Sequence, residues 1–203
     1  MTIKINERFT MSPANPPATV VFSMSSDEVP LPSWDDLAKE IHANNVAKGF
    51  WPDDVMTRNV GEALALVHSE ITEAWDAAQT GTADDKLPEF PGVAVELADA
   101  AIRLLDLGGA YGVEFSVVDE LTSNNSPDPY AAISEDLCEL HAHVDAALEH
   151  HRKNRIEDFK MSVAMALGYT LAVMGKYGFD EEIIIIEKVE FNKGRPYKHG
   201  KSY

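Results

Sequence analysis

Two pairs of acidic residues carry the strongest chemical signal in this 203-residue chain. Glu70 and Glu73 lie three positions apart in a stretch whose apolar residues recur with helical period. The next such stretch repeats that spacing at Glu96 and Asp99. A three-residue step on a helix leaves two side chains about 60° apart and one turn apart in height, so each pair can turn both carboxylates toward one point.

If the two helices are antiparallel neighbours, all four carboxylates converge. Such a cluster is costly to bury without partners, and a hard divalent cation relieves that cost because it prefers oxygen ligands. The pattern therefore predicts a site for Mg²⁺, which Mn²⁺ can also fill. The predicted ligands are Glu70, Glu73, Glu96 and Asp99. The alternative stays open that each pair lies on a solvated helix face, where this spacing is common.

Two further residues on the second stretch are placed to take part. Arg103 follows Asp99 by four positions and is expected to hold a carboxylate. Asp106 follows Asp99 by seven positions, on nearly the same helix face, and is expected to extend the site.

The end of the chain is unusually basic for a protein with a net charge of −17. Lys and Arg residues gather there within a short strip, at Lys188, Lys193, Arg195, Lys198 and Lys201. Lys acts on phosphate oxygens as a point charge and Arg as a fork, so the strip predicts a phosphate grip; a solvated tail is the alternative. The overall negative charge repels nucleic acid, which is not expected as a partner.

Helical periodicity organises the chain after its first 32 residues. Caps and stop signals predict helices over 34–48, from 57 or 59 to 79, over 91–109, 130–153 and 156–177, and around 183–186. The Ser-, Asn- and Pro-containing stretch at 122–129 predicts a linker. The expected organisation is an N-terminal arm (1–32), one domain (33–190) and a basic tail (191–203).

A faint internal repeat relates the two halves of that domain. Residues 61–70 resemble 134–143, and residues 109–114 resemble 175–180. Two helical hairpins, 57–109 and 130–178, therefore predict an all-α fold with a four-helix-bundle core, since one hairpin cannot bury its apolar stripe alone. In this alignment Glu70 corresponds to His143 and Glu96 to Ser162, so the second hairpin is expected to lack the metal site.

Composition favours a cytoplasmic setting. The single cysteine, Cys138, cannot form an internal disulfide, and no apolar run approaches the ~18–20 residues needed to cross a bilayer. The chain also begins without the basic-then-apolar layout of a secretory signal. We therefore expect no membrane partner.

The acidic motif resembles that of the all-α nucleoside triphosphate pyrophosphatases, which include the MazG-like proteins and the dimeric dUTPases. Glu70-x-x-Glu73 is followed, after twenty-two residues, by Glu96-x-x-Asp99. The Lys48-Gly-Phe-Trp51 segment is similar to the loop before the second helix of MazG-like proteins.

The C-terminal strip strengthens the resemblance. Residues 188–201 are very like the C-terminal motif of the MazG-like proteins. Lys188, Asn192 and Arg195 also match the Lys-Asn-Arg spacing at the end of dimeric dUTPases.

The resemblance implies a Mg²⁺-dependent, homodimeric enzyme that hydrolyses a (deoxy)nucleoside triphosphate to the monophosphate and pyrophosphate. Glu70 or Glu73 would accept the proton from the attacking water. The phosphates would be held by Lys188, Asn192 and Arg195. An apolar wall with a few polar groups suits a base, and the candidates are Asn44, Asn45, Phe50 and Trp51.

Two alternatives stay open at this point. A second hairpin without acids resembles the dimeric dUTPase plan, which suggests a dUTPase-like or dCTPase-like enzyme of the same fold. A non-catalytic bundle that senses nucleotides or binds a partner would also keep these residues. A di-iron bundle is not expected, because it needs Glu-x-x-His pairs and no Glu here has His three positions later.

Overall fold

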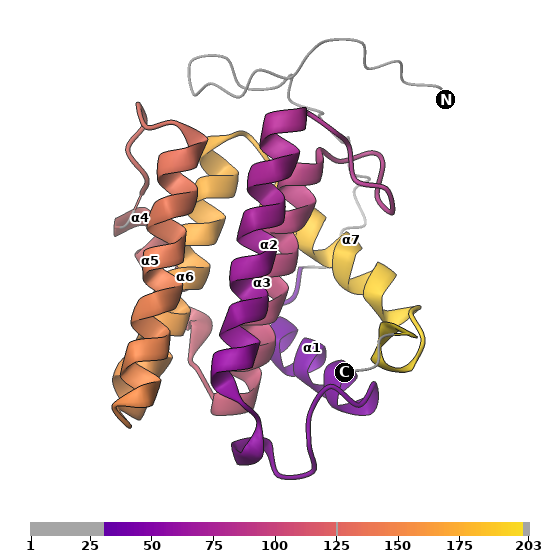
Figure 1. Cartoon of the computed structure of the whole chain (residues 1–203), viewed down its shortest axis with the longest axis vertical. Coiled ribbons are helices and arrows are strands. Elements are labelled where there is room, and N and C mark those ends of the chain that lie inside the picture. The colour runs from indigo at the N-terminus through magenta and orange to yellow at the C-terminus, as the bar shows by residue number, and fades with distance from the viewer. Residues whose placement is uncertain (1–30, 125, 201–203) are drawn as a thin grey trace.

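The computed structural model describes residues 31–124 and 126–200 (Figure 1). The α-helices in this part of the chain are α1 (Trp34–Ala47), α2 (Val60–Thr80), α3 (Gly92–Tyr111), α4 (Val118–Asn124), α5 (Ile133–Arg152), α6 (Ile156–Lys176) and α7 (Glu181–Lys193). The short 3₁₀-helices are η1 (Val55–Thr57), η2 (Phe115–Val117) and η3 (Tyr197–Gly200). The described residues contain no β-strand, so the predicted all-α fold class is confirmed.

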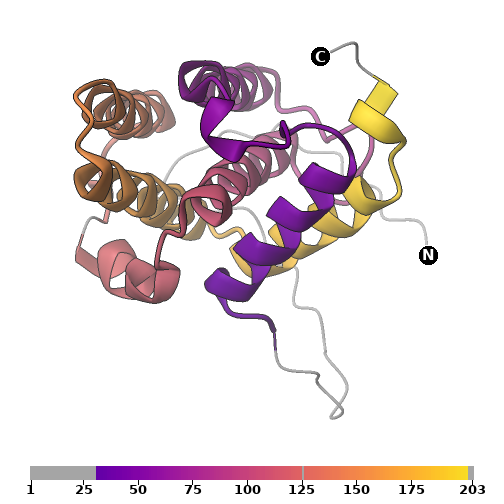
Figure 2. The ribbon, with the colours of Figure 1, turned by 90° about the horizontal axis from the view of Figure 1, so that it is seen from below.

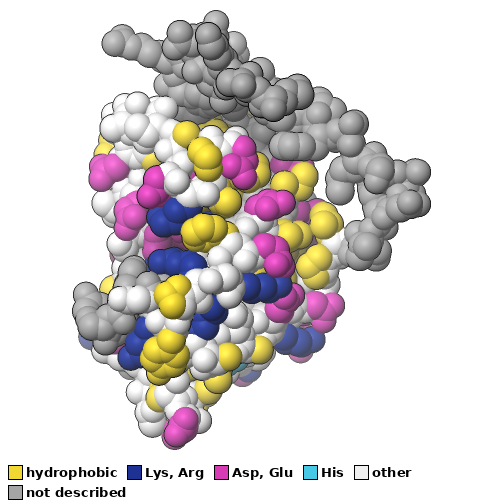
Figure 3. Space-filling view, turned by 90° about the vertical axis from the view of Figure 1, so that its right-hand side faces the viewer, with side chains coloured by type: hydrophobic (Ala, Val, Ile, Leu, Met, Phe, Trp, Pro, Cys, Tyr) yellow, Lys and Arg dark blue, Asp and Glu magenta, His cyan; other side chains and the backbone are white. Residues whose placement is uncertain are grey.

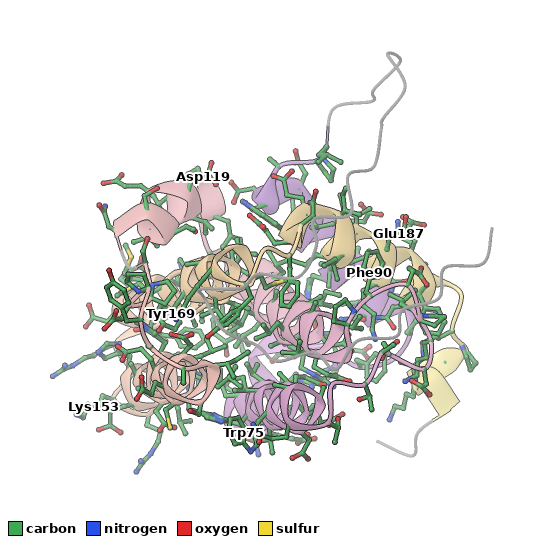
Figure 4. All side chains as sticks on the ribbon, turned by 90° about the horizontal axis from the view of Figure 1, so that it is seen from above. Trp75, Phe90, Asp119, Lys153, Tyr169 and Glu187 are labelled. Atoms are coloured by element: carbon green, nitrogen blue, oxygen red, sulfur yellow. The ribbon has the colours of Figure 1, made fainter. Side chains whose placement is uncertain are left out.

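Helices α2, α3, α5 and α6 form a four-helix bundle. The α2–α3 and α5–α6 pairs are hairpins, and the two hairpins pack together through α2 on α5 and α3 on α6. Viewed along the bundle, Trp75 of α2 and Tyr169 of α6 mark two of these helices (Figure 4). Fully buried leucines, including Leu64 of α2, Leu104 of α3 and Leu140 of α5, fill the space between them.

Three helices cover the outside of the bundle. α4 packs on α6, whereas α1 and α7 both pack on α3, as the view from below shows (Figure 2). α1 begins where the Ser33 hydroxyl accepts from Asp36 N, and α7 begins where Asp180 accepts from Ile183 N. These capping bonds fix the start of each helix. Together, α1 and α7 cover one side of the first hairpin.

None of the described helices is both long and apolar enough to cross a membrane.

Helices α1, α2, α3, α5 and α6 begin and end within about three residues of the predicted positions, and the ambiguous stretch around 183–186 is helical, as favoured. α7 is longer than that stretch, and α4 was not predicted. The 122–129 linker is shorter than expected, because residues 122–124 belong to α4. Most of the predicted N-terminal arm, residues 1–30, lies outside the described residues.

Helix α3 continues through the Gly108-Gly109 pair, which the sequence suggested as its stop. The true C-cap is Gly112, which has a positive φ of 64°. A Cβ at Gly108 would lie 2.2 Å from the Phe115 ring, and a Cβ at Gly109 would lie 2.7 Å from the Ala38 carbonyl oxygen. The pair therefore serves close packing of α3 against η2 and α1.

Candidate metal centre

Three of the four predicted ligands meet between the helices of the first hairpin. Glu70 projects from α2, and Glu96 and Asp99 project from α3. One carboxylate oxygen from each residue lies within 4.8 Å of those from the other two. No second group of His, Cys, Asp or Glu side chains has this spacing in the part of the chain that the structure describes. We call these three residues the acidic triad.

Glu70 is the most buried member of the triad, with 6% of its surface exposed. Arg103, on α3, donates from Nε to Glu70 Oε1 at 2.6 Å, and its Nη2 approaches the same oxygen. Burial raises the pKa of the Glu70 carboxyl, and the Arg103 guanidinium opposes that rise. Arg103 thus holds a carboxylate, as predicted, through Oε1, and the described contact leaves Oε2 for another ligand.

Lys188 brings a buried cation to the triad. It projects from α7, is only 3% exposed, and places its Nζ 2.9 Å from Asp99 Oδ2. A buried ammonium is strongly unfavourable without such a partner. The interpretation of the basic strip as a solvated tail is therefore wrong for Lys188.

Glu96 has no ion-pair partner among the described residues, unlike Glu70 and Asp99. Burial, followed by the negative charges of Asp99, Glu70 and Glu73, raises the pKa of the Glu96 carboxyl to about 8. When all three carboxylates are ionised, the triad carries three negative charges against the two positive charges of Arg103 and Lys188. Hard divalent cations bind this kind of all-oxygen donor set, and the residues present fit Mg²⁺ or Mn²⁺.

Glu73, the fourth predicted ligand, is exposed and does not belong to the triad. Its Oε1 accepts from Ser69 Oγ at 3.1 Å. Its charge nevertheless raises the pKa of both Glu70 and Glu96, which places it near the edge of the site. The structure therefore gives Glu70 and Glu73 different settings: one is fixed by Arg103 and the other is open to solvent.

The rest of the basic strip is anchored to the loop that follows α1. Lys48 Nζ donates to the Lys193 carbonyl at 2.9 Å and also to the Arg195 carbonyl. The backbone N–H of Lys198 donates to the Lys48 carbonyl at 2.9 Å. Gly49 has a φ of 77°, and a Cβ there would lie 2.1 Å from the Tyr197 hydroxyl oxygen. Figure 3 shows Lys and Arg side chains gathered on the face that includes α7.

Asn192 and Arg195 do not contact the triad. Arg195 Nη1 donates to Asn192 Oδ1 at 3.4 Å, and both side chains are half-buried at the end of α7. Lys193 instead pairs with Glu190 and with Glu40 of α1. Of the three predicted phosphate ligands, only Lys188 therefore reaches the acidic triad.

A small hollow, with room for about one water molecule, lies beside Trp51 and next to Arg103. It is lined by Trp51, Arg58, Ala63, Leu66, Arg103, Asp106 and Leu107. The Trp51 indole is 6% exposed, and its Nε1 donates to Asp106 Oδ1 at 2.9 Å. His42 Nδ1 lies 3.0 Å from the same oxygen. The expectation that Asp106 extends the metal site is therefore wrong, because its carboxylate holds Trp51 and His42.

The other predicted base contacts do not line this pocket. Asn44 and Asn45 lie at the end of α1, where their carbonyls accept from Lys48 N and Phe50 N. The Phe50 carbonyl accepts from Arg58 Nη1. These three residues shape the loop that carries Trp51.

Sequence reasoning missed the position of Arg58 and the partners of Asp106. Arg58 lies over the Trp51 ring, 4.9 Å from its centroid, and nothing in its local sequence indicates this contact. Asp106 was recognised by its spacing from Asp99, but its partners come from 64 and 55 residues away along the chain.

The chain matches no family model, no curated protein and no solved structure.

Proposed function

We propose that the protein hydrolyses a (deoxy)nucleoside triphosphate to the monophosphate and pyrophosphate with the help of Mg²⁺. The observation that carries this proposal is the acidic triad with Lys188 at 2.9 Å from Asp99. A negatively charged cluster that already contains a buried ammonium suits a divalent cation and a phosphate chain together. The resemblance to MazG-like and dUTPase-like proteins supports the same chemistry.

Each charged residue has a role in this proposal. Glu70, Glu96 and Asp99 would hold the ion, which supplies charge neutralisation and Lewis acidity when bound. Arg103 fixes the Glu70 carboxylate in position. Glu73, which is exposed beside the triad, would accept the proton of the attacking water at a carboxylate oxygen.

The basic residues of α7 would bind the phosphate chain. Lys188 is in place to hold an oxygen next to the triad. Arg195 and Asn192 are fixed through the Lys48 contacts to the loop that carries Trp51. Phosphates bound by α7 would therefore have a defined position relative to the loop that carries Trp51.

A dUTPase-like or dCTPase-like enzyme is the nearest alternative. The observation that favours it is the presence of two hairpins of matched helix length, with 21 and 20 residues in the first and 20 and 21 in the second. Both versions share the site, and they differ in the base accepted. We propose a homodimer in either case, which light scattering of the purified protein would test.

Pyrophosphate release from a panel of dNTPs and NTPs, with and without Mg²⁺, tests the proposal. We expect turnover of at least one nucleotide that depends on Mg²⁺ and is lost in Glu96→Gln. Lys39→Met, an exposed substitution on α1, is the matched control and should behave as wild type. Nucleotide binding without any pyrophosphate release would instead support the sensor alternative.

A further inference from the structure

Lys188 already neutralises part of the negative charge of the acidic triad. Its side chain projects from α7, is 3% exposed, and places Nζ 2.9 Å from Asp99 Oδ2. A lysine this deeply buried is rare, because its ammonium loses its water and needs an acceptor in return. Asp99 supplies that acceptor, and no second ion-pair partner of Lys188 exists among the described residues. The position of the ammonium therefore depends on the carboxylate of Asp99.

Arg103, the other cation of the triad, is held in a different way. It approaches Glu70 Oε1 with two nitrogens, Nε at 2.6 Å and Nη2. A guanidinium keeps such a contact as a rigid planar group, whereas an ammonium on a flexible four-carbon stem makes one point contact. Of the two cations, Lys188 is therefore the one that can exchange its acceptor by rotating its side chain.

A divalent cation at the triad and the Lys188 ammonium would share one carboxylate. Asp99 contributes one of the three oxygens that lie within 4.8 Å of one another, and its other role is to accept from Lys188. Two cations on the same carboxylate repel each other, most strongly where solvent is scarce. The pair is still open to ligands, because 22% of the Asp99 side chain is exposed. The ion would therefore bind against the ammonium, unless the ammonium finds another acceptor.

We propose that Lys188 is the resident counter-ion of the triad and passes from Asp99 to a phosphate oxygen when a divalent cation and a polyphosphate bind together. This inference rests on the proposed function and adds how the binding of the two ligands is coupled. With Arg103 and Lys188 included, binding of the ion changes the ionised triad from one net negative to one net positive charge. That positive charge attracts the polyphosphate, whose oxygens accept from the released ammonium. The ion thus binds weakly alone and more tightly with the polyphosphate.

Calorimetric titration with Mn²⁺ alone tests the competition for Asp99 without requiring turnover. Lys188→Met removes the competing charge and keeps a flexible, unbranched side chain that suits a buried site. This variant should bind Mn²⁺ about tenfold more tightly than wild type. Lys188→Arg keeps the positive charge and should bind Mn²⁺ as weakly as wild type. Lys39→Met removes a positive charge from an exposed site on α1, so it is the matched control and should behave as wild type.

Titration with pyrophosphate, at a Mn²⁺ concentration that saturates every variant, tests the transfer to phosphate. Under this condition the metal complex of pyrophosphate in solution is the same for each protein, so any difference in affinity comes from the site. Lys188→Met should bind this complex about tenfold more weakly than wild type, because the ammonium donor is missing. One substitution therefore changes the two affinities in opposite directions, which a general loss of structure would not do.

Several outcomes would overturn the exchange. Weaker Mn²⁺ binding in Lys188→Met would make Lys188 a residue that only positions Asp99 for the ion. Tighter Mn²⁺ binding in Lys188→Arg would show that the charge of the side chain is not the cause. Unchanged affinities in Lys188→Met would remove the inference, and the proposed function would stand if Mn²⁺ binding is still lost in Glu96→Gln. Failure of wild type to bind Mn²⁺ or its pyrophosphate complex, together with no pyrophosphate release, would remove the proposed function as well.

Discussion

The two hairpins of the bundle differ in the partners that they provide for a buried carboxylate. In the second hairpin Asp136 is 1% exposed, and its Oδ2 accepts from Lys176 Nζ at 2.6 Å and from Tyr177 Oη at 2.8 Å. In the first hairpin Glu96 has no ion-pair partner among the described residues and lies beside two other carboxylates. The Asp136 carboxylate is paired within the chain, whereas the triad has three carboxylates and only two cationic partners among the described residues.

This difference fits a structural role for Asp136 and the ligand-binding role that we propose for the triad. The Asp136 cluster ties α5 to α6 and also fixes the segment before α5, since Lys176 donates to the Asp128 and Ala131 carbonyls. At the positions aligned with the metal ligands, the second hairpin has neutral side chains. His143 packs against the Tyr169 ring with centroids 4.8 Å apart, and the Ser162 hydroxyl lies 2.8 Å from His150 Nδ1. The number of carboxylates alone would not distinguish the two hairpins. The number of cationic partners available to the buried carboxylates does.

The largest expected effect is on turnover. Glu96→Gln removes a charged ligand from the triad, and we expect kcat/KM for the preferred nucleotide to fall by a factor of about 10³ or more. His143→Ala, at the aligned position of the second hairpin, should stay within about twofold of wild type. Pyrophosphate release measured on both purified variants makes the comparison. Similar losses of kcat/KM in the two variants would contradict the proposal that only the first hairpin carries the catalytic site.

A large effect on stability is expected from the second hairpin. Asp136→Ala leaves the buried Lys176 ammonium and the Tyr177 hydroxyl without their acceptor. Breaking a buried pair in this way costs ~3–5 kcal/mol, so the urea midpoint should fall sharply. The turnover of the molecules that remain folded should be unchanged. Glu139→Ala, an exposed acid on the same helix, is the control and should shift the midpoint little.

Ligand-linked stability gives a third test of the contrast. A ligand that binds only the native state at 100 times its Kd stabilises it by about 2.7 kcal/mol. For a domain of this size, that corresponds to a rise in Tm of roughly 5–10 °C. We expect Mg²⁺ to give such a rise for wild type and His143→Ala, and little or none for Glu96→Gln. An equal rise in all three proteins would place the cation elsewhere.

The sequence was sufficient for the fold because helix signals are local. Apolar period, caps such as Asn59, whose side chain accepts from Glu62 N, and left-handed glycines such as Gly81 mark the ends of α2. The same information predicted the triad, because each acidic pair borders the apolar stripe that its helix turns toward the core. The Gly108-Gly109 pair misled, because a glycine required for close packing looks the same in sequence as a glycine that ends a helix.

The pocket could not be predicted because its contacts are not local. The side chain that fixes Trp51 is Asp106, from a different helix, and no spacing rule connects them. The position of Glu73 was also beyond the sequence, since a rotation of α2 by a fraction of a turn decides whether it joins the triad. Arg58 had no motif at all, and only the folded loop places it over the Trp51 ring.

The smallest expected effect is on the pH dependence of stability without divalent cations. The folded-state pKa of Glu96, raised to about 8 by burial and by the neighbouring acids, lies above its value in the unfolded chain, near 4.5. Between these two values the native state binds more protons than the unfolded state, so stability falls as the pH rises from about 5 to 8. Glu96 is only partly buried, and solvent screening reduces the effect to a Tm difference of roughly a few degrees. Glu96→Gln should flatten this slope relative to wild type in melting curves recorded with a chelator, and saturating Mg²⁺ should flatten it in wild type because the bound ion keeps the carboxylate ionised. An unchanged slope in Glu96→Gln would mean that Glu96 is already ionised in the cation-free protein, and the electrical contrast with Asp136 would then be smaller than the structure implies.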